Sequence, residues 1–166
     1  MSPTRIPNPI LLGADEIGWF DALPGEALAI RVPGSQTGNA FAIAEAIIAP
    51  EAGPPLHIHH SFDEVIYVLE GTVDFVCGAE RLRTGPGGMM VIPRGTPHSF
   101  RNFGDMPARL LGVFTPGGFE QMFLEMEGRP VSDMVELSAK YQMEIVGGPI
   151  DRPAGERVPA RRIIAG

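Results

Sequence analysis

Four potential metal ligands lie in two separate blocks of this chain, each bracketed by glycine and proline, and this spacing constrains the fold more than any other feature. The blocks cover residues 53–71 and 87–102, and the four ligands are His57, His59, Glu64 and His98. Residues two apart on an extended chain point the same way, so His57 and His59 can present both imidazoles to one face. His98 is distant in sequence and can complete the set only if the sheet curls round on itself.

The side-chain types in this set predict a metal site. Imidazole nitrogens together with one carboxylate suit a borderline divalent metal, and fewer than six protein ligands leave positions open for chemistry. The alternative is a fold that keeps these side chains but works without a metal or binds one weakly. His60 points away from His59 if the strand continues, so we expect His60 at the rim or in solvent. Cys77 is the only cysteine, and we interpret it as a small hydrophobic residue at a strand end.

The spacings resemble the two motifs of the cupin superfamily, usually written G-x5-H-x-H-x3or4-E-x6-G and G-x5-P-x-G-x2-H-x3-N. The second motif matches at all of its fixed positions, which are Gly87, Pro93, Gly95, His98 and Asn102. The first matches at His57, His59, Glu64 and Gly71. Its leading glycine position holds Glu51, and the nearest glycine is Gly53, two residues later. This departure alters the turn that enters the strand and removes no ligand. The resemblance covers about residues 27–116.

The resemblance and the strand pattern together predict an all-β fold, an antiparallel jelly-roll (cupin) β-barrel with one or two C-terminal helices. Strand-like segments cover residues 27–32, 40–48, 64–69, 72–77, 89–92, 97–102 and 108–114. We expect residues 72–77 to pair with residues 64–69 after the turn at Gly71. Apolar residues at helical spacing predict a helix over residues 119–126. A second helix is expected to begin near Asp133, whose spacing to Glu136 resembles a capping box.

The length of 166 residues suits one hydrophobic core, and the 21 glycines and 17 prolines suit many short strands joined by tight turns. We predict an N-terminal extension over residues 1–26 and a cupin barrel over residues 27–116. A helical segment over residues 117–148 and an extended tail over residues 149–166 complete the division. Both faces of the segment 40–48 are largely apolar, which favours a homodimer.

Charge and composition exclude several classes of partner. The net charge of −7 disfavours nucleic acid and anionic membranes, which need a basic surface. No apolar run is long enough to span a bilayer, and residues 1–9 lack the layout of a secretory signal. One cysteine allows no internal disulfide, which fits a reducing compartment. We therefore expect a cytoplasmic protein whose partner is a small-molecule substrate.

Three classes of function remain open. The chain resembles quercetin 2,3-dioxygenase-like cupins, which implies a dioxygenase acting on a flavonol or another phenolic compound. One divalent transition metal per chain is expected, iron first, with manganese, nickel, copper and zinc as alternatives. Glu64 would be both a metal ligand and the catalytic base for the substrate hydroxyl. Phe100 shares the parity of His98 and is expected to line the pocket.

The second class is a non-redox isomerase or lyase acting on a sugar or a keto acid, with the metal as a Lewis acid. Such substrates need inward-facing cations, and the candidates are Arg94, Arg101 and Arg109. Arg101 has parity opposite to that of His98 and is expected to face outward. The third class is a non-catalytic binding protein. Asn102 is expected to serve a turn or a strand edge and to have no catalytic role.

Overall fold

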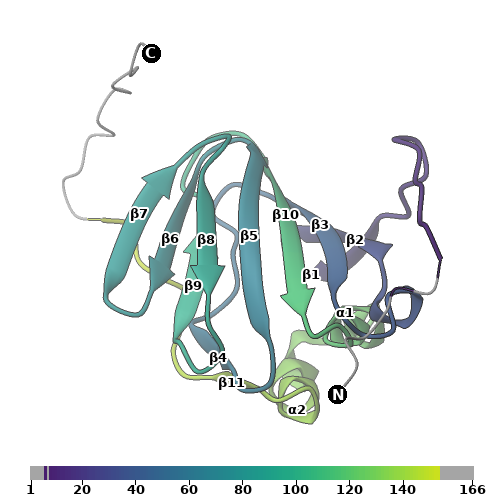
Figure 1. Cartoon of the computed structure of the whole chain (residues 1–166). Helices are drawn as coiled ribbons and strands as arrows, with labels where there is room; N and C mark the ends of the chain where they lie inside the picture. The colour runs from purple at the N-terminus through teal and green to yellow at the C-terminus, as the bar shows by residue number, and fades with distance from the viewer. Residues whose placement is uncertain (1–5, 7, 154–166) are drawn as a thin grey trace.

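Two antiparallel β-sheets face each other in the computed structural model, which describes residue 6 and residues 8–153 (Figure 1). The first sheet has the order β1 (Phe20–Leu23), β2 (Glu26–Val32), β3 (Ala42–Ile48), β10 (Ala108–Thr115), β5 (Asp63–Glu70) and β8 (Met89–Ile92). The second has the order β11 (Met143–Ile145), β4 (His57–His59), β9 (His98–Arg101), β6 (Val73–Cys77) and β7 (Glu80–Thr84). The predicted all-β class with antiparallel strands is confirmed.

Alternation along the strands places the core between the sheets. On β5, the buried residues Glu64, Ile66 and Val68 alternate with partly exposed neighbours, which is the pattern of a strand with one covered face. Ile66 and Val68 pack with Val73 of the opposite sheet in one apolar cluster. The only charged member of the inward row of β5 is Glu64, so its position in this row needs a functional explanation.

The turn at Gly71 joins the two sheets, which corrects the predicted pairing of residues 64–69 with residues 72–77. β5 pairs with β10 and β8, whereas β6 pairs with β7 and β9. Gly71 has φ +78°, and a Cβ added there would lie 2.7 Å from the Cα of Ala108. The chain therefore turns tightly over the first residue of β10 and crosses to the other sheet. A short connection of this kind looks like a hairpin in sequence but forms a corner of the sandwich.

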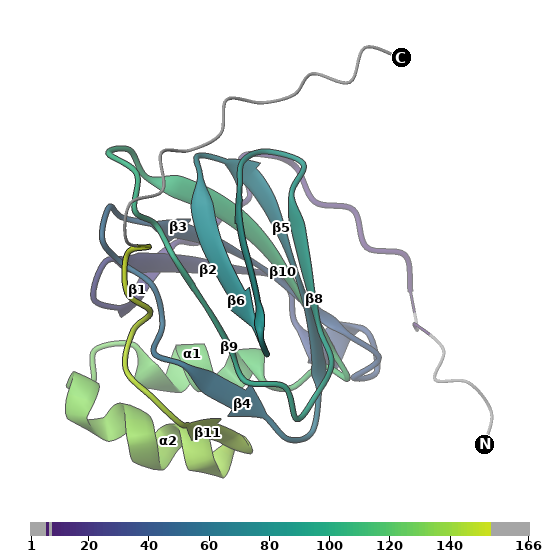
Figure 2. The same cartoon turned by 90° about the vertical axis from the view of Figure 1, so that its left-hand side faces the viewer.

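Two short helices, α1 (Glu120–Met126) and α2 (Met134–Lys140), pack against each other at one end of the sheets, with α1 next to β1 and α2 next to β11 (Figures 1 and 2). Both confirm the predicted helical pattern. Phe119, which directly precedes α1, and Met122 and Met126 within it are buried in the core. The predicted capping box does not form, because no side-chain hydrogen bond caps α2. Asp133 instead ends the 3-10 turn η2 (Val131–Asp133), in which its backbone N–H donates to the Pro130 carbonyl.

Elements outside the predicted barrel range also join the sheets. β1 pairs with β2, and β11 pairs with β4. A second 3-10 turn, η1 (Gly34–Gln36), follows β2. Most of the predicted tail over residues 149–166 lies outside the described residues. Within the described part of the chain, no helix has the length and hydropathy needed to cross a membrane.

Candidate metal centre

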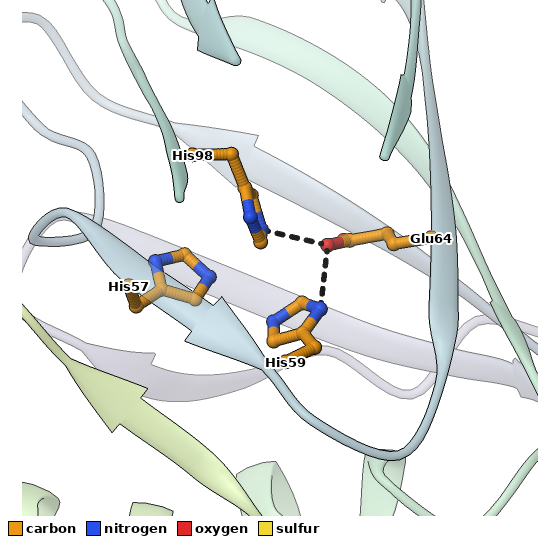
Figure 3. A group of neighbouring side chains, drawn as sticks. All are labelled: His57, His59, Glu64 and His98. Atoms are coloured by element: carbon orange, nitrogen blue, oxygen red, sulfur yellow. Dashed lines mark ion pairs between the residues drawn. The ribbon is translucent and has the colours of Figure 1, made fainter. Parts of the chain in front are cut away.

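The four predicted ligands meet between the two sheets (Figure 3). All four are buried, and one ligand atom from each lies within 4.8 Å of the others. His57 and His59 occupy alternate positions of β4, so both side chains face inward. Glu64 projects from β5 of the opposite sheet, and His98 is the first residue of β9. The structure therefore brings together the whole predicted set.

Two backbone carbonyls fix the ring orientation of two of the histidines. His57 Nδ1 lies 2.7 Å from the Pro55 carbonyl oxygen, and His98 Nδ1 lies 2.9 Å from that of Thr96. A carbonyl oxygen only accepts hydrogen bonds, so each Nδ1 carries the proton and donates. The remaining nitrogen, Nε2, then has a free lone pair. This arrangement is typical of histidines that bind metals.

Several buried nitrogen atoms in the cluster lack a hydrogen-bond partner among the described residues. These are both ring nitrogens of His59 and the Nε2 atom of His98. Glu64 Oε2 lies 3.5 Å from His59 Nδ1 and 3.4 Å from His98 Nε2, at the far limit of a hydrogen bond. Buried polar atoms are normally satisfied, and a neutral imidazole has one free lone pair, so one ring nitrogen of His59 and Nε2 of His98 beside the Glu64 carboxylate fit a cation placed among them. The residues present therefore fit one metal ion.

Burial keeps two of the histidines, His57 and His59, in the neutral form that binds metals. Burial, with added repulsion from the neighbouring His98, lowers the pKa of His57 to about 3. Burial also holds the pKa of His59 far below its ordinary value, with added repulsion from the other histidines. The His59 ring stacks on Phe62 with 4.0 Å between the ring centroids, which shields it from water. Neutral imidazole is the ligating form, so near neutral pH no proton competes with a metal at these two rings.

The ligands open into an apolar cavity of about 80 Å³ between the sheets and α1. Its apolar lining includes Leu28, Ile66, Phe100, Phe114, Phe119 and Met122. The predicted pocket position of Phe100 is therefore confirmed. No arginine or lysine occurs among the described residues that line the cavity. Walls of this composition suit an apolar or aromatic ligand better than a highly charged one.

Other residues singled out in the sequence lie outside the cluster. His60 is exposed, and its Nε2 lies 2.9 Å from Glu144 Oε2, which confirms the predicted rim position. Asn102 is fully buried and bonds only to the backbone, through Nδ2 to the Ile48 and Met106 carbonyls. Its predicted role at a turn is confirmed.

The three candidate arginines all face away from the cavity. Arg94 Nη2 lies 2.8 Å from Asp63 Oδ2 at the surface, and Arg109 Nη2 lies 2.6 Å from Glu45 Oε2. Arg101 donates to the Ile150 carbonyl at 3.2 Å. The cation that a sugar phosphate or a keto acid needs is therefore not supplied by any of the three.

Sequence reasoning missed two carboxyl groups of the cavity, Glu26 and Glu45, of which Glu45 pairs with Arg109. Glu26, the first residue of β2, lines the cavity together with the four ligands. It lies two residues before the inward-facing Leu28 and so shares its face, and an extension of the expected strand by one residue would have placed it inward. The predicted strand began at residue 27, directly after it.

Comparisons with known proteins agree with this geometry. A family model described as a cupin domain matches residues 44–114. Protein SchB from Streptomyces halstedii is 32% identical over 108 residues, which cover 58% of this chain and 77% of SchB. Quercetin 2,3-dioxygenase from Bacillus subtilis is 35% identical over 72 residues, 43% of this chain and 21% of that protein.

The solved structure of a sugar phosphate isomerase from a cupin superfamily of Silicibacter pomeroyi is also similar. It is 27% identical, with a TM-score of 0.56, over 64% of this chain and 75% of that one. The chain spans about half the length of several curated relatives that it matches, between 40% and 63%.

Proposed function

The chain belongs to the cupin family, and from this premise we propose that it is a metal-dependent dioxygenase acting on a small phenolic substrate. One observation carries the proposal. The four-ligand cluster opens into a cavity with apolar and aromatic walls, and the described lining contains no arginine or lysine. A phenolic ring fits such walls, and its hydroxyl oxygen suits the polar end where the ligands lie.

His57, His59, Glu64 and His98 would hold the metal. A first-row ion bound there, iron in our proposal, supplies Lewis acidity and redox chemistry with dioxygen. His57 and His59 stay neutral through burial, and the backbone carbonyls that accept from Nδ1 leave the Nε2 lone pairs of His57 and His98 free. The surrounding phenylalanines exclude water and orient an aromatic body.

Glu64 is the residue that we assign to accept the hydroxyl proton of the substrate. Its Oε2 faces His59 and His98, whereas its Oε1 makes no hydrogen bond with the described residues. A carboxylate beside a cation remains ionised and can take a proton from a phenol that binds next to it. We assign this transfer to Oε1.

The volume of the cavity favours a single-ring substrate. The space measures about 80 Å³, whereas pockets for drug-sized ligands typically measure about 300–1,000 Å³. A three-ring flavonol would need displacement of α1 or of the cavity walls. A monocyclic phenol or catechol needs less displacement, so we place it ahead of a flavonol.

A second candidate function is a non-redox isomerase or lyase. The likeness to the Silicibacter pomeroyi sugar phosphate isomerase, at 27% identity, favours it. The lack of a cation among the described cavity residues argues against a phosphorylated or carboxylated substrate, because such a charge would be buried without a partner. The dioxygenase therefore ranks first.

The first test is elemental analysis of protein purified without an affinity tag and without chelators. We expect close to one iron per chain, or uptake of one iron on anaerobic reconstitution. The iron-loaded protein should then consume oxygen with a monocyclic phenol or catechol, and Glu64→Gln should not. His60→Gln is the matched control, because His60 is exposed and lies outside the cluster.

Each alternative gives a different result. A protein that neither contains nor takes up a metal would exclude both enzyme functions and leave a binding protein. Metal uptake without oxygen consumption, together with isomerisation of a sugar by the zinc-loaded protein, would favour the second candidate. In that case Glu64 would serve a proton transfer that needs no dioxygen.

A further inference from the structure

Glu26 is a buried carboxyl group without a partner. Its side chain lies at the start of β2 and is 7% exposed. It makes no hydrogen bond or ion pair with the described residues, whereas Glu120, which is buried even more deeply, accepts two backbone N–H groups. A buried polar group without a partner is unfavourable. Glu26 therefore needs an explanation other than stability.

The position of Glu26 suggests an explanation for its burial. It lines the metal cavity, and it also lines a separate open groove of about 530 Å³ beside the β1–β2 turn. Leu23 is shared by both spaces, and the far side of the groove is formed by residues 126, 128, 129 and 131. Glu26 and Leu23 thus form part of the wall of both the cavity and the surface groove.

Burial raises the pKa of Glu26 to about 7, so its protonated form is well populated near neutral pH. Asp21 and Arg129 line the same groove, and Glu45 and the four metal-ligand candidates line the same cavity. The cause of the shift is burial and not a charge on any of these groups. A neutral carboxyl can both donate and accept a hydrogen bond.

We propose that Glu26 is a specificity-determining residue of the metal cavity, which hydrogen-bonds a polar substituent of an aromatic ligand whose other end faces the four ligands. The aromatic class of the ligand rests on the proposed function. Between the two polar positions the walls are apolar, including Leu28, Ile66 and Leu110. The cavity would thus favour a ring with a hydroxyl or carbonyl group remote from the metal-binding oxygens.

Two ligands of almost equal shape test this proposal: 1,2,4-benzenetriol, and 4-methylcatechol, in which a methyl group replaces one hydroxyl. Their affinities are measured by titration calorimetry, without oxygen, on zinc-loaded protein so that no turnover occurs. The wild type should bind the triol about tenfold more tightly, the effect expected of one buried hydrogen bond. Glu26→Gln should keep that preference, because an amide also donates and accepts.

Glu26→Leu should lose the preference while binding 4-methylcatechol at least as well as the wild type. Glu80→Gln, at an exposed strand position outside the cavity lining, is the control and should match the wild type. Equal preference in the Leu variant and the wild type would overturn the proposal. So would a wild type that binds both ligands equally or binds neither.

The outcome is separable from that of the proposed function. If iron-loaded protein consumes no oxygen but the Leu variant loses the preference, the dioxygenase is wrong and Glu26 still selects the ligand. If oxygen is consumed and the Leu variant keeps the preference, the dioxygenase stands and the proposed role of Glu26 is wrong. Unfolding curves of both Glu26 variants check that each remains folded.

Discussion

The backbone of Gly53 lies directly against the carbonyl group of Phe100: a Cβ atom added to Gly53 would be 2.2 Å from that oxygen. This contact explains the departure of the first motif, in which Glu51 occupies the leading glycine position. The close approach occurs two residues later, where the chain does have a glycine. Glu51 itself adopts a positive φ of 62°, and its carboxylate pairs with Arg152 at the surface.

Gly53→Ala should therefore destabilise the fold and weaken metal binding together. The methyl group would push the following Pro54-Pro55 segment away from β9, and the Pro55 carbonyl is the group that orients His57. We expect a loss of about 2–4 kcal/mol in the free energy of unfolding, as for other buried steric conflicts. Urea unfolding and a metal titration would measure the two effects.

Gly148→Ala is the matched control for this substitution. A Cβ at Gly148 meets no atom within 4 Å, and its φ is not in the left-handed region. We expect a change within about 0.5 kcal/mol, as for ordinary surface substitutions. An equal loss in both variants would show that the Phe100 contact has no special effect.

Removing one ligand of the cluster should abolish stabilisation by metal. In wild type, an excess of metal at 100 times its dissociation constant should add about 2.7 kcal/mol to the free energy of unfolding. His98→Ala and Glu64→Ala should lose most of this increment and most of the bound metal. His60→Ala should keep both, since His60 contacts Glu144 at the surface. Thermal unfolding with and without metal measures the stabilisation, and elemental analysis measures the bound metal. An equal loss in His60→Ala would mean that the ligand set is wrong.

The ligand set was predictable from sequence because local rules place most of it. Strand alternation alone puts His57 and His59 on one face, and the motif spacing adds Glu64 and His98. Sheet membership was not predictable in this way. The short turn at Gly71 is compatible with a hairpin or a corner, and only the packing over Ala108 decides between them.

The burial of Glu26 beside the cavity was missed for a related reason. A glutamate at the start of a short strand is usually exposed, and the sequence gives no measure of the cavity that surrounds it. The strand β7 was also missed, because Glu80–Thr84 is charged and largely exposed and has no apolar alternation. The burial of a side chain depends on elements that are distant in the sequence, whereas strand alternation depends only on neighbouring residues.

Glu26 should make the stability of the protein fall as pH rises. Its folded pKa is about 7, compared with an ordinary value of 4.5. Below pH 4.5 the group is protonated in both states; between 4.5 and 7 the unfolded chain loses the proton first, so unfolding becomes easier. The shift corresponds to about 3 kcal/mol in total, reached above pH 7.

Glu26→Gln removes this titration, and its comparison with wild type isolates the effect. Urea unfolding at pH 5 and pH 8 should show that the variant gains stability relative to wild type at the higher pH. Glu80→Gln should follow the wild type at both values, since Glu80 is exposed. Parallel pH profiles for wild type and Glu26→Gln would mean that the carboxyl is not desolvated in the folded protein.

Asn102 should stabilise the fold without contacting the ligand cluster. Its Nδ2 donates to the carbonyls of Ile48 and Met106, and its Oδ1 accepts from Gly104 N–H at 2.8 Å. Asn102→Ala leaves all three backbone groups without that partner, so we expect a loss of about 2–4 kcal/mol in the free energy of unfolding. Asn102→Asp should be at least as damaging, because a carboxylate cannot donate to the two carbonyls.

Asn8→Ala is the control for that pair of variants, since Asn8 is exposed, and it should leave stability unchanged. The metal dissociation constant of the folded Asn102→Ala protein, measured well below its unfolding temperature, should stay within about threefold of the wild type. This follows because the orienting carbonyls of His57 and His98 belong to Pro55 and Thr96, which Asn102 does not bind. A large loss of metal affinity with unchanged stability would instead place Asn102 in the metal centre, and its hydrogen bonds to the turn would not be its main role.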